Sequence, residues 1–358
     1  MALRVLFIAR RFPPSIGGIQ THCHQLYTHL SEKCDIKLLA LGRNSLVHLL
    51  WFIPYVIIKG TILCCRNSVD VIYLADGVTG FLAPFFKKLC KSKIVITVYG
   101  LEMTYKNAFA RHLMVNGVRT ADKVAVISEN TRSTTLKLGV EPQKLKLIYV
   151  GVEPPEVSEE RRKSLREKFQ KEYNISFKED RVLLNFGRLI PRKGVAAFLE
   201  NGFGMLDNDI KLIIGGDGPD YQRICQIREN SAFKERIIIL RNPSDEVIAM
   251  LRNSADLFVF PNIPYKNDIE GFGMTQLESM YSGMPVVAFA VDALVESVRE
   301  GGYLIEPKNY RAFAEAIHNY FNLPEKKRAA KRQEAQSYVR REYNWEKTSS
   351  EYLKLFEN

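Results

Sequence analysis

Short apolar runs recur along this chain and alternate with stretches in which apolar residues follow a helical period. The runs are rich in Val, Ile and Leu and nearly continuous, which is typical of strands buried on both faces of a parallel sheet. Six of them lie in the first half of the chain, over 3–9, 34–41, 69–75, 93–99, 123–128 and 145–150. Six more lie in the second half, over 181–187, 210–216, 236–240, 257–261, 285–289 and 303–306. Two such series predict an α/β protein with two doubly wound domains.

The boundary between the two series lies at GVEPPEVSEE, residues 151–160, where two prolines and several charges follow the sixth run. This composition is typical of a linker. We therefore expect a first domain over 1–152, a second over 153–340 and a terminal helix over 341–358. A length of 358 residues suits two domains.

One segment, residues 46–65, is apolar almost throughout. It is close to the roughly 20 residues that a membrane-spanning helix needs. However, His48, Pro54 and Lys59 interrupt it, and it lies between two predicted core strands. We interpret it as a crossover helix of the first domain; a partly exposed face that touches a membrane is the less favoured alternative.

The positive charge of the chain is concentrated in its first half. The formal net charge is +11. Residues 1–150 hold 20 Lys and Arg against 8 Asp and Glu, whereas residues 151–358 hold 31 against 32. A basic domain attracts an anionic membrane or a phosphorylated substrate. No signature of a nucleic-acid-binding fold accompanies this charge, so we expect no nucleic-acid partner.

The cysteines and the first residues of the chain indicate a cytoplasmic protein. No CxxC pair is present, and no cluster of His and Cys has the spacing of a zinc site. We therefore expect no metal, and reduced thiols at Cys23, Cys34, Cys64, Cys65, Cys90 and Cys225. The first apolar run is too short for a signal peptide, which favours a buried strand.

The strongest candidate site is EGFGMTQLESMYSGMPVVAF at 270–289. Its glycines predict a turn followed by a short helix that stops at Gly283. A helix that opens on a glycine turn has free backbone N–H groups, which suit a phosphate or diphosphate. Glu270 and Glu278 lie on either side of this turn, where carboxylates can accept hydrogen bonds from sugar or ribose hydroxyls. The residues expected to contact the ligand between them are Gly271, Phe272, Gly273, Met274 and Thr275.

The first strand of each domain is followed by residues that suit a phosphate: two cations in the second domain and a pair of glycines in the first. Arg188 and Lys193 follow the first strand of the second domain, at the edge where open α/β sheets bind ligands. Such cations can neutralise a diphosphate, and we interpret the adjacent Arg192 as a solvated neighbour. Gly17 and Gly18 follow the first strand of the chain and let backbone amides approach a phosphate closely.

Taken in order, these segments resemble retaining GT-B glycosyltransferases, and the spacing of the two glutamates resembles the E-x7-E signature of glycosyltransferase family 4. The resemblance covers nearly the whole chain. It implies two Rossmann-like domains facing a central cleft, with an acceptor-binding first domain, a donor-binding second domain and a terminal helix that crosses back to the first. The segments that carry it are FPPSIGGIQTH, NFGRLIPRKG, IIGGDGP, PSDEVIAMLRNSADLFVFP, the 270–289 segment and YNWEKTSSEYLKLF.

The chain departs from the family pattern at several positions. Tyr99 stands where the family has a His near the transferred sugar, and a Tyr can hydrogen-bond to sugar hydroxyls but is a poor base. Glu102 takes the place of an acid that we expect to meet the acceptor. Arg241 replaces a Gly near the nucleotide base, and Glu296 remains from a Gly-Gly-x-x-E motif that has lost its glycines. The changes at Arg241 and at 291–296 bear on the identity of the donor rather than on the fold.

The resemblance implies a retaining hexosyltransferase that moves a sugar from a nucleotide-diphosphate sugar to a glycan or lipid-linked acceptor, in cell-surface polysaccharide or glycolipid synthesis. It assigns catalysis to Glu270, Arg188, Lys193 and Tyr99, and implies no metal or other cofactor. Two alternatives stay open: a GT-B sugar-nucleotide epimerase, and a silent sugar-nucleotide-binding protein. A nicotinamide-dependent dehydrogenase is disfavoured, because IGGDGPDYQ lacks the Gly-x-Gly-x-x-Gly spacing. We expect a cytoplasmic protein that can contact an anionic membrane face.

Overall fold

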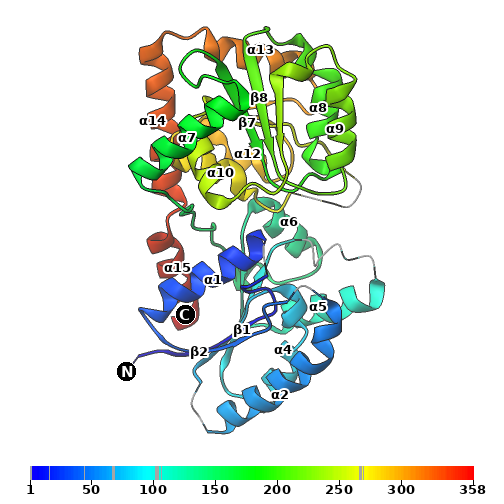
Figure 1. Cartoon of the computed structure of the whole chain (residues 1–358). Coiled ribbons are helices and arrows are strands. Elements are labelled where there is room, and N and C mark those ends of the chain that lie inside the picture. Colours follow the sequence, from blue (N-terminus) through cyan, green and yellow to red (C-terminus); the bar gives the residue numbers. More distant parts are fainter. Residues whose placement is uncertain are drawn as a thin grey trace. The chain divides into compact units, whose positions relative to one another are not determined.

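A computed structural model describes residues 2–15, 17–43, 45–66, 69–100, 105, 107–265, 268 and 270–358. The chain divides into two compact units (Figure 1). Unit 1 comprises Met1–Gly151 together with Tyr343–Asn358, and unit 2 comprises Val152–Glu342. Each unit contains one six-stranded parallel sheet, so the predicted α/β fold with two doubly wound domains is confirmed.

Unit 1 is built on a sheet of order β2-β1-β3-β4-β5-β6. Its strands are β1 (Arg4–Ala9), β2 (Asp35–Ala40), β3 (Val71–Leu74), β4 (Lys93–Val98), β5 (Lys123–Val126) and β6 (Leu145–Leu147). Its helices are α1 (Gly18–Ser31), α2 (Leu49–Cys65), α3 (Gly77–Gly80), α4 (Ala83–Leu89), α5 (Ala108–Thr120), α6 (Glu129–Lys137) and α15 (Trp345–Glu357). All six strands fall within the predicted runs, because these runs supply the side chains of both sheet faces.

Unit 2 repeats this plan with a sheet of order β12-β11-β10-β7-β8-β9. Its strands are β7 (Arg181–Phe186), β8 (Ile210–Gly215), β9 (Ile237–Leu240), β10 (Leu257–Phe260), β11 (Val286–Phe289) and β12 (Gly302–Ile305). Its helices are α7 (Glu159–Tyr173), α8 (Val195–Asn201), α9 (Tyr221–Glu229), α10 (Asp245–Arg252), α11 (Met274–Tyr281), α12 (Leu294–Ser297), α13 (Tyr310–Phe321) and α14 (Glu325–Glu342). Of the predicted linker at 151–160, residues 151–158 have no regular secondary structure, and the last two residues open α7.

The two faces of the unit 1 sheet are covered by different helices. One face packs on α2, α4 and α5 through Phe52, Phe86 and Val118. The other packs on α1 and α15 through Leu26 and Tyr352. Because α15 follows all the elements of unit 2 in the sequence, unit 1 is built from two separate segments of the chain.

Helix α2 is the crossover between β2 and β3 that the sequence predicts for the apolar segment 46–65. No helix in the described residues is long and apolar enough to cross a membrane. Cys64 at the end of α2 and Cys90 just after α4 form a disulfide, with Cα atoms 5.6 Å apart. The prediction that all thiols are reduced is therefore wrong for this pair, because helix packing brings together two cysteines far apart in sequence.

Candidate functional site

The site in unit 2 begins with the order of its strands. β7 and β10 are neighbours in the middle of the sheet, and the chain leaves them toward opposite edges. The loops that follow these two strands therefore meet at the carboxyl edge of the sheet, which is the usual ligand position in an open α/β sheet. The loop after β7 carries Lys193, and the loop after β10 carries Glu270.

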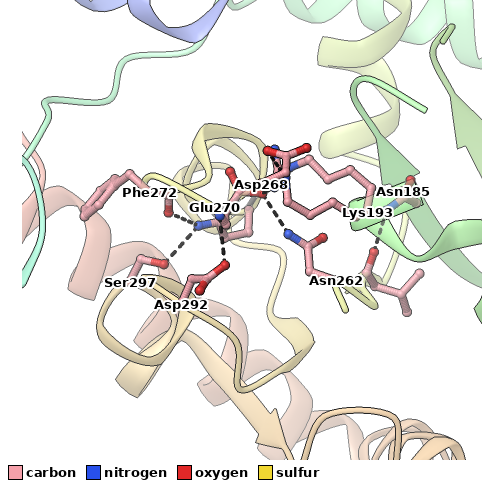
Figure 2. Close-up of polar contacts among 11 residues, drawn as sticks. Asn185, Lys193, Asn262, Asp268, Glu270, Phe272, Asp292 and Ser297 are labelled. Atoms are coloured by element: carbon pink, nitrogen blue, oxygen red, sulfur yellow. Dashed lines mark hydrogen bonds and ion pairs between the residues drawn. The ribbon is translucent and has the colours of Figure 1, made fainter. Parts of the chain in front are cut away.

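Glu270 is the centre of a buried polar cluster (Figure 2). Its Oε2 accepts hydrogen bonds from Lys193 Nζ at 2.6 Å and from Asn262 Nδ2 at 2.7 Å, and it also pairs with the Arg192 guanidinium. Its backbone N–H donates to Asp292 Oδ2 at 2.9 Å. Sequence and topology thus bring Glu270 and Lys193 together as expected.

The charge states of this cluster follow from competition between burial and ion pairing. Burial alone would raise the pKa of Glu270, but Lys193 and Arg192 outweigh it and hold that pKa at about 2. Burial lowers the pKa of Lys193, while Glu270 acts in the opposite direction. The Lys193 ammonium also lies 4.2 Å from the centre of the Phe260 ring. The site therefore holds an ionised carboxylate among cations.

Arg192 belongs to the site, contrary to its interpretation as a solvated neighbour. Its side chain is only 4% exposed and pairs with both Glu270 and Asp268. The turn that places it ends at Gly194, where φ is +67° and a Cβ would lie 1.9 Å from the Pro261 carbonyl oxygen. The close approach of the two loops therefore turns Arg192 inward, which its sequence position alone does not indicate.

The predicted glycine turn opens α11 as expected. Gly273 has φ +76° and is the N-cap of the helix, with no side chain capping the first turn. Helix α11 runs over Met274–Tyr281, and Gly283 follows with φ +82°. The first-turn N–H groups are thus available for an anion.

Glu278 lies further along α11, with its side chain 23% exposed. Burial raises the pKa of Glu278 to about 7, although Arg252 Nη1 lies 3.6 Å from its Oε2 and opposes the shift. The two predicted glutamates therefore differ in charge state: Glu270 is ionised and paired through its Oε2, whereas Glu278 titrates near neutral pH.

A hollow of about 280 Å³ opens beside these groups at the ends of β7, β8 and β9. Arg188, Gly216 and Asn242 are among its lining residues. Gly216 has φ +146°, and a Cβ there would lie 1.9 Å from the Gly187 carbonyl oxygen. The loops after β7 and β8 can therefore approach this closely because residue 216 has no side chain. A Cβ on Gly187 would in turn contact Thr275 at 3.5 Å, which places the hollow next to the start of α11.

Arg241 pairs with Asp217, one of the residues that line this hollow. Its guanidinium pairs with Asp217 at 3.1 Å and covers the Tyr221 ring at 4.8 Å. The side chain is 62% exposed. A guanidinium over an aromatic ring forms a flat, cationic surface, and the placement of Arg241 near a bound base stays a prediction.

The candidate residues of unit 1 lie at the corresponding edge of its own sheet. Gly17 is the N-cap of α1, with φ +151°, and Gly18 is the first residue of that helix. Tyr99 follows β4 but is buried, with its hydroxyl 3.8 Å from Cys23 Sγ. Its hydroxyl therefore faces the core, which does not fit the predicted contact with sugar hydroxyls. Glu102 lies outside the described residues.

Several polar residues of these edges are absent from the sequence prediction. Asn262 is fully buried at the end of β10, and Asp292 follows β11. Both follow the carboxyl end of a strand, where open α/β sheets bind ligands, so this generalisation could have identified them from the sequence. In unit 1, Arg10 and Asp76 follow β1 and β3 and form a buried ion pair at 3.3 Å. Within the described part of the chain, no group of three His, Cys, Asp or Glu side chains could hold a metal ion.

Comparison with known proteins finds sequence similarity to glycosyltransferases. Residues 166–337 match the family described as Glycosyl transferases group 1. An uncharacterized glycosyltransferase of Methanocaldococcus jannaschii, MJ1607, is 25% identical over 68% of the chain, but the match covers 64% of that relative, less than two thirds of its length. A GDP-mannose-dependent alpha-(1-6)-phosphatidylinositol monomannoside mannosyltransferase of Mycolicibacterium smegmatis is 23% identical and covers 91% of each chain.

A solved structure matches both units. HepE (Alr3699) of Anabaena, in complex with UDP, superposes with a TM-score of 0.79, 18% sequence identity and coverage of 98% of this chain and 99% of that one. The fold is thus that of the two-domain, Rossmann-like GT-B proteins. The sequence matches reported above are also to glycosyltransferases.

Proposed function

We propose that the chain is a retaining glycosyltransferase of family 4 that transfers a hexose from a nucleotide-diphosphate sugar to a glycan or lipid-linked acceptor. The observation that carries the proposal is the buried Glu270–Lys193–Arg192 cluster beside the uncapped start of α11. It places an ionised carboxylate, fixed cations and free backbone N–H groups at one sheet edge.

These groups suit the departure of a nucleoside diphosphate. As the bond between the anomeric carbon and the diphosphate breaks, negative charge grows on the leaving oxygen. Lys193, the exposed Arg188 and the first N–H groups of α11 would stabilise that charge, and each preorganised donor of this kind contributes about 3–4 kcal/mol to lowering the barrier. Cationic side chains then supply the charge that a metal supplies elsewhere, so we propose a metal-independent reaction.

The two glutamates would hold the rest of the donor. Glu270 has its second carboxylate oxygen left to accept hydrogen bonds from the sugar ring, since Oε2 takes all three protein contacts given above. Glu278, on the same helix, would accept hydrogen bonds from the ribose. In a retaining reaction the acceptor attacks from the face that the leaving group occupies, so an orienting role for Glu270 is more suitable than a nucleophilic one.

The choice of donor and acceptor rests on relatives. The mycobacterial relative uses GDP-mannose and a phosphatidylinositol mannoside, and HepE binds UDP. A thermal-shift screen of UDP-, GDP- and ADP-sugars identifies the donor, because a ligand at 100 times its Kd adds about 2.7 kcal/mol of stability. If no nucleotide sugar shifts the transition, the proposed function is wrong.

The test of the site is Glu270→Gln, with Asp268→Asn as the matched control. Both carboxylates pair with Arg192, but Asp268 is 39% exposed whereas Glu270 is 9% exposed. We expect E270Q to lower transfer about 100-fold, because the sugar and both cations lose their fixed positions, and D268N to stay near wild type. Loss of a buried carboxylate also costs about 3 kcal/mol of stability, so transfer is measured well below Tm.

Three results would count against the assignment. Full transfer by E270Q would remove Glu270 from the mechanism. Conversion of the donor to an epimer without an acceptor would identify an epimerase. Nucleotide-sugar binding without turnover on any lipid or glycan acceptor would identify a silent binding protein.

A further inference from the structure

Helix α2 presents an apolar stripe to the outside of unit 1. Its buried positions, Phe52, Val56, Gly60 and Cys64, repeat every four residues and face the sheet. A helix that covers a sheet normally has polar residues on its other face, and a helix that is apolar all round is normally buried. Here the outer face is apolar and exposed: Leu50, Trp51, Tyr55, Ile58 and Ile62, with Val47 just before the helix, are between 41% and 78% exposed.

The stripe continues onto the neighbouring helices of the same layer. Leu89 at the end of α4 is 52% exposed, and Phe109 on α5 is 72% exposed. The disulfide between Cys64 and Cys90 joins the ends of α2 and α4, and Figure 1 shows the two helices on the same side of unit 1. Among the described residues of unit 1, every large apolar side chain that is strongly exposed lies between Val47 and Leu113.

Positive charge exceeds negative charge around the stripe, where Asp122 pairs with one of the cations, Lys87. Residues 36–69 and 77–101, which contain α2 and α4, hold no Asp or Glu. They do hold Arg43 and Arg66 at either end of α2, Lys59 within it, and a group of lysines at and after the end of α4, which are Lys87, Lys88 and Lys91. Apolar side chains beside long cationic ones are the pattern of a helix that lies in a membrane surface.

We propose that this face, defined by the exposed side chains of α2 with Leu89 and the flanking cations, docks on an anionic lipid bilayer. Trp51 and the aliphatic side chains would enter the boundary between headgroups and acyl chains, while the Lys and Arg heads reach the lipid phosphates. A second copy of this chain is a poorer occupant, because two copies would bring like charges together. The proposal concerns unit 1 alone and does not depend on the transferase assignment.

Tryptophan fluorescence gives a direct test with the full chain. The chain has two tryptophans: Trp51 is 52% exposed, whereas Trp345 is 5% exposed. Vesicles of phosphatidylcholine with phosphatidylglycerol should shift the Trp51 emission to the blue, and vesicles of phosphatidylcholine alone should do so far less. Trp51→Phe should abolish the shift while the chain still cosediments with the vesicles.

Two variants and one control separate the contributions. Ile58→Glu should lower the partition coefficient at least about tenfold, since it places a charge in the apolar stripe. Lys59→Gln with Lys88→Gln should lower it roughly 30-fold at low salt, because each surface cation contributes about fivefold. Met205→Glu, at a side chain 52% exposed in unit 2, should have no effect.

The proposal is overturned if binding ignores the anionic lipid fraction and the salt concentration, or if I58E binds vesicles as wild type does. It is also overturned if light scattering shows a dimer that I58E converts to a monomer while vesicle binding is absent. Circular dichroism of each variant verifies that the fold persists.

Discussion

At the residue scale, Glu278 is a carboxyl whose charge changes near neutral pH. Burial raises its pKa from an unfolded value of 4.5 to about 7. The folded state therefore holds the proton more tightly, and the resulting stabilisation is present below about pH 4.5 and lost as the pH rises through 7. A shift of about 2.5 units corresponds to about 3 kcal/mol.

Glu278→Gln should remove this pH dependence. We expect the unfolding free energy of the variant to lie within about 1 kcal/mol of wild type near pH 5, where the folded Glu278 is neutral, and to exceed it by up to about 3 kcal/mol at pH 8. Urea unfolding from pH 5 to 8 measures the difference. Glu334→Gln, at a side chain 44% exposed, is the control and should give a flat difference. A flat difference for E278Q as well would mean that Arg252 keeps Glu278 ionised throughout.

Residue type and position in the sequence predicted some residues of the site and missed others. Glu270 and Lys193 could be found because each follows a strand that ends at the switch in strand order. Arg192 could not, since its inward turn depends on the contact between Gly194 and Pro261, residues 67 positions apart. Tyr99 was placed correctly after β4, but its orientation depends on Cys23 and His22 from α1, with which it packs.

At the scale of elements, the strands were the most predictable feature. Eleven of the twelve apolar runs contain their strand in full, and β12 begins one residue before its run. This agreement arises because a strand covered on both faces is apolar over most of its length. The order of the strands within each sheet was harder to predict from the sequence, since it depends on how the crossover helices pack on the sheet. The disulfide is an example of this limit, as Cys64 and Cys90 become neighbours only after α2 and α4 pack on the same sheet face.

The glycine turn of α11 can be tested against the glycine at the other end of the helix. Gly273 and Gly283 have similar φ angles, +76° and +82°, so Ala at either position stores strain of about 1–3 kcal/mol. Only Gly273→Ala also alters the N-terminal turn, where a Cβ would lie 2.5 Å from Gln276 Oε1. We expect G273A to weaken nucleotide binding about tenfold or more through misplaced N–H groups, and G283A to leave it unchanged.

Calorimetric titration of the two variants with the nucleotide found in the screen measures this difference. Equal affinities for G273A and G283A would show that the start of α11 does not hold the ligand.

At the scale of the whole molecule, unit 1 depends on a helix that follows unit 2 in the chain. Trp345 of α15 stacks on His29 with ring centres 5.5 Å apart and packs so closely on Gly151 that a Cβ there would lie 2.4 Å from its ring. Tyr352 of the same helix hydrogen-bonds to Thr97 of β4 at 2.9 Å. The second series of elements is thus enclosed within the sequence of the first.

Trp345→Ala should destabilise unit 1 selectively. Removing a buried Trp costs about 3–5 kcal/mol, and hydrogen exchange should accelerate in α1 and β1 but not in β7 and β8. Trp51→Ala is the matched control, because Trp51 is 52% exposed and its loss should change stability by less than about 0.5 kcal/mol. Equal acceleration in both units would show that they unfold as one.

This interleaving has a consequence for synthesis on the ribosome. All six strands of unit 1 emerge first, but the sheet face that α15 covers stays bare until Val152–Glu342 have been translated. At ordinary elongation rates this wait lasts roughly 10–40 s. Unit 2 is contiguous and can close its core during that interval, so the part of the protein made first is the last to be completed. Chaperones should therefore bind nascent chains mainly at the apolar surface of α1 and β1 that α15 later covers.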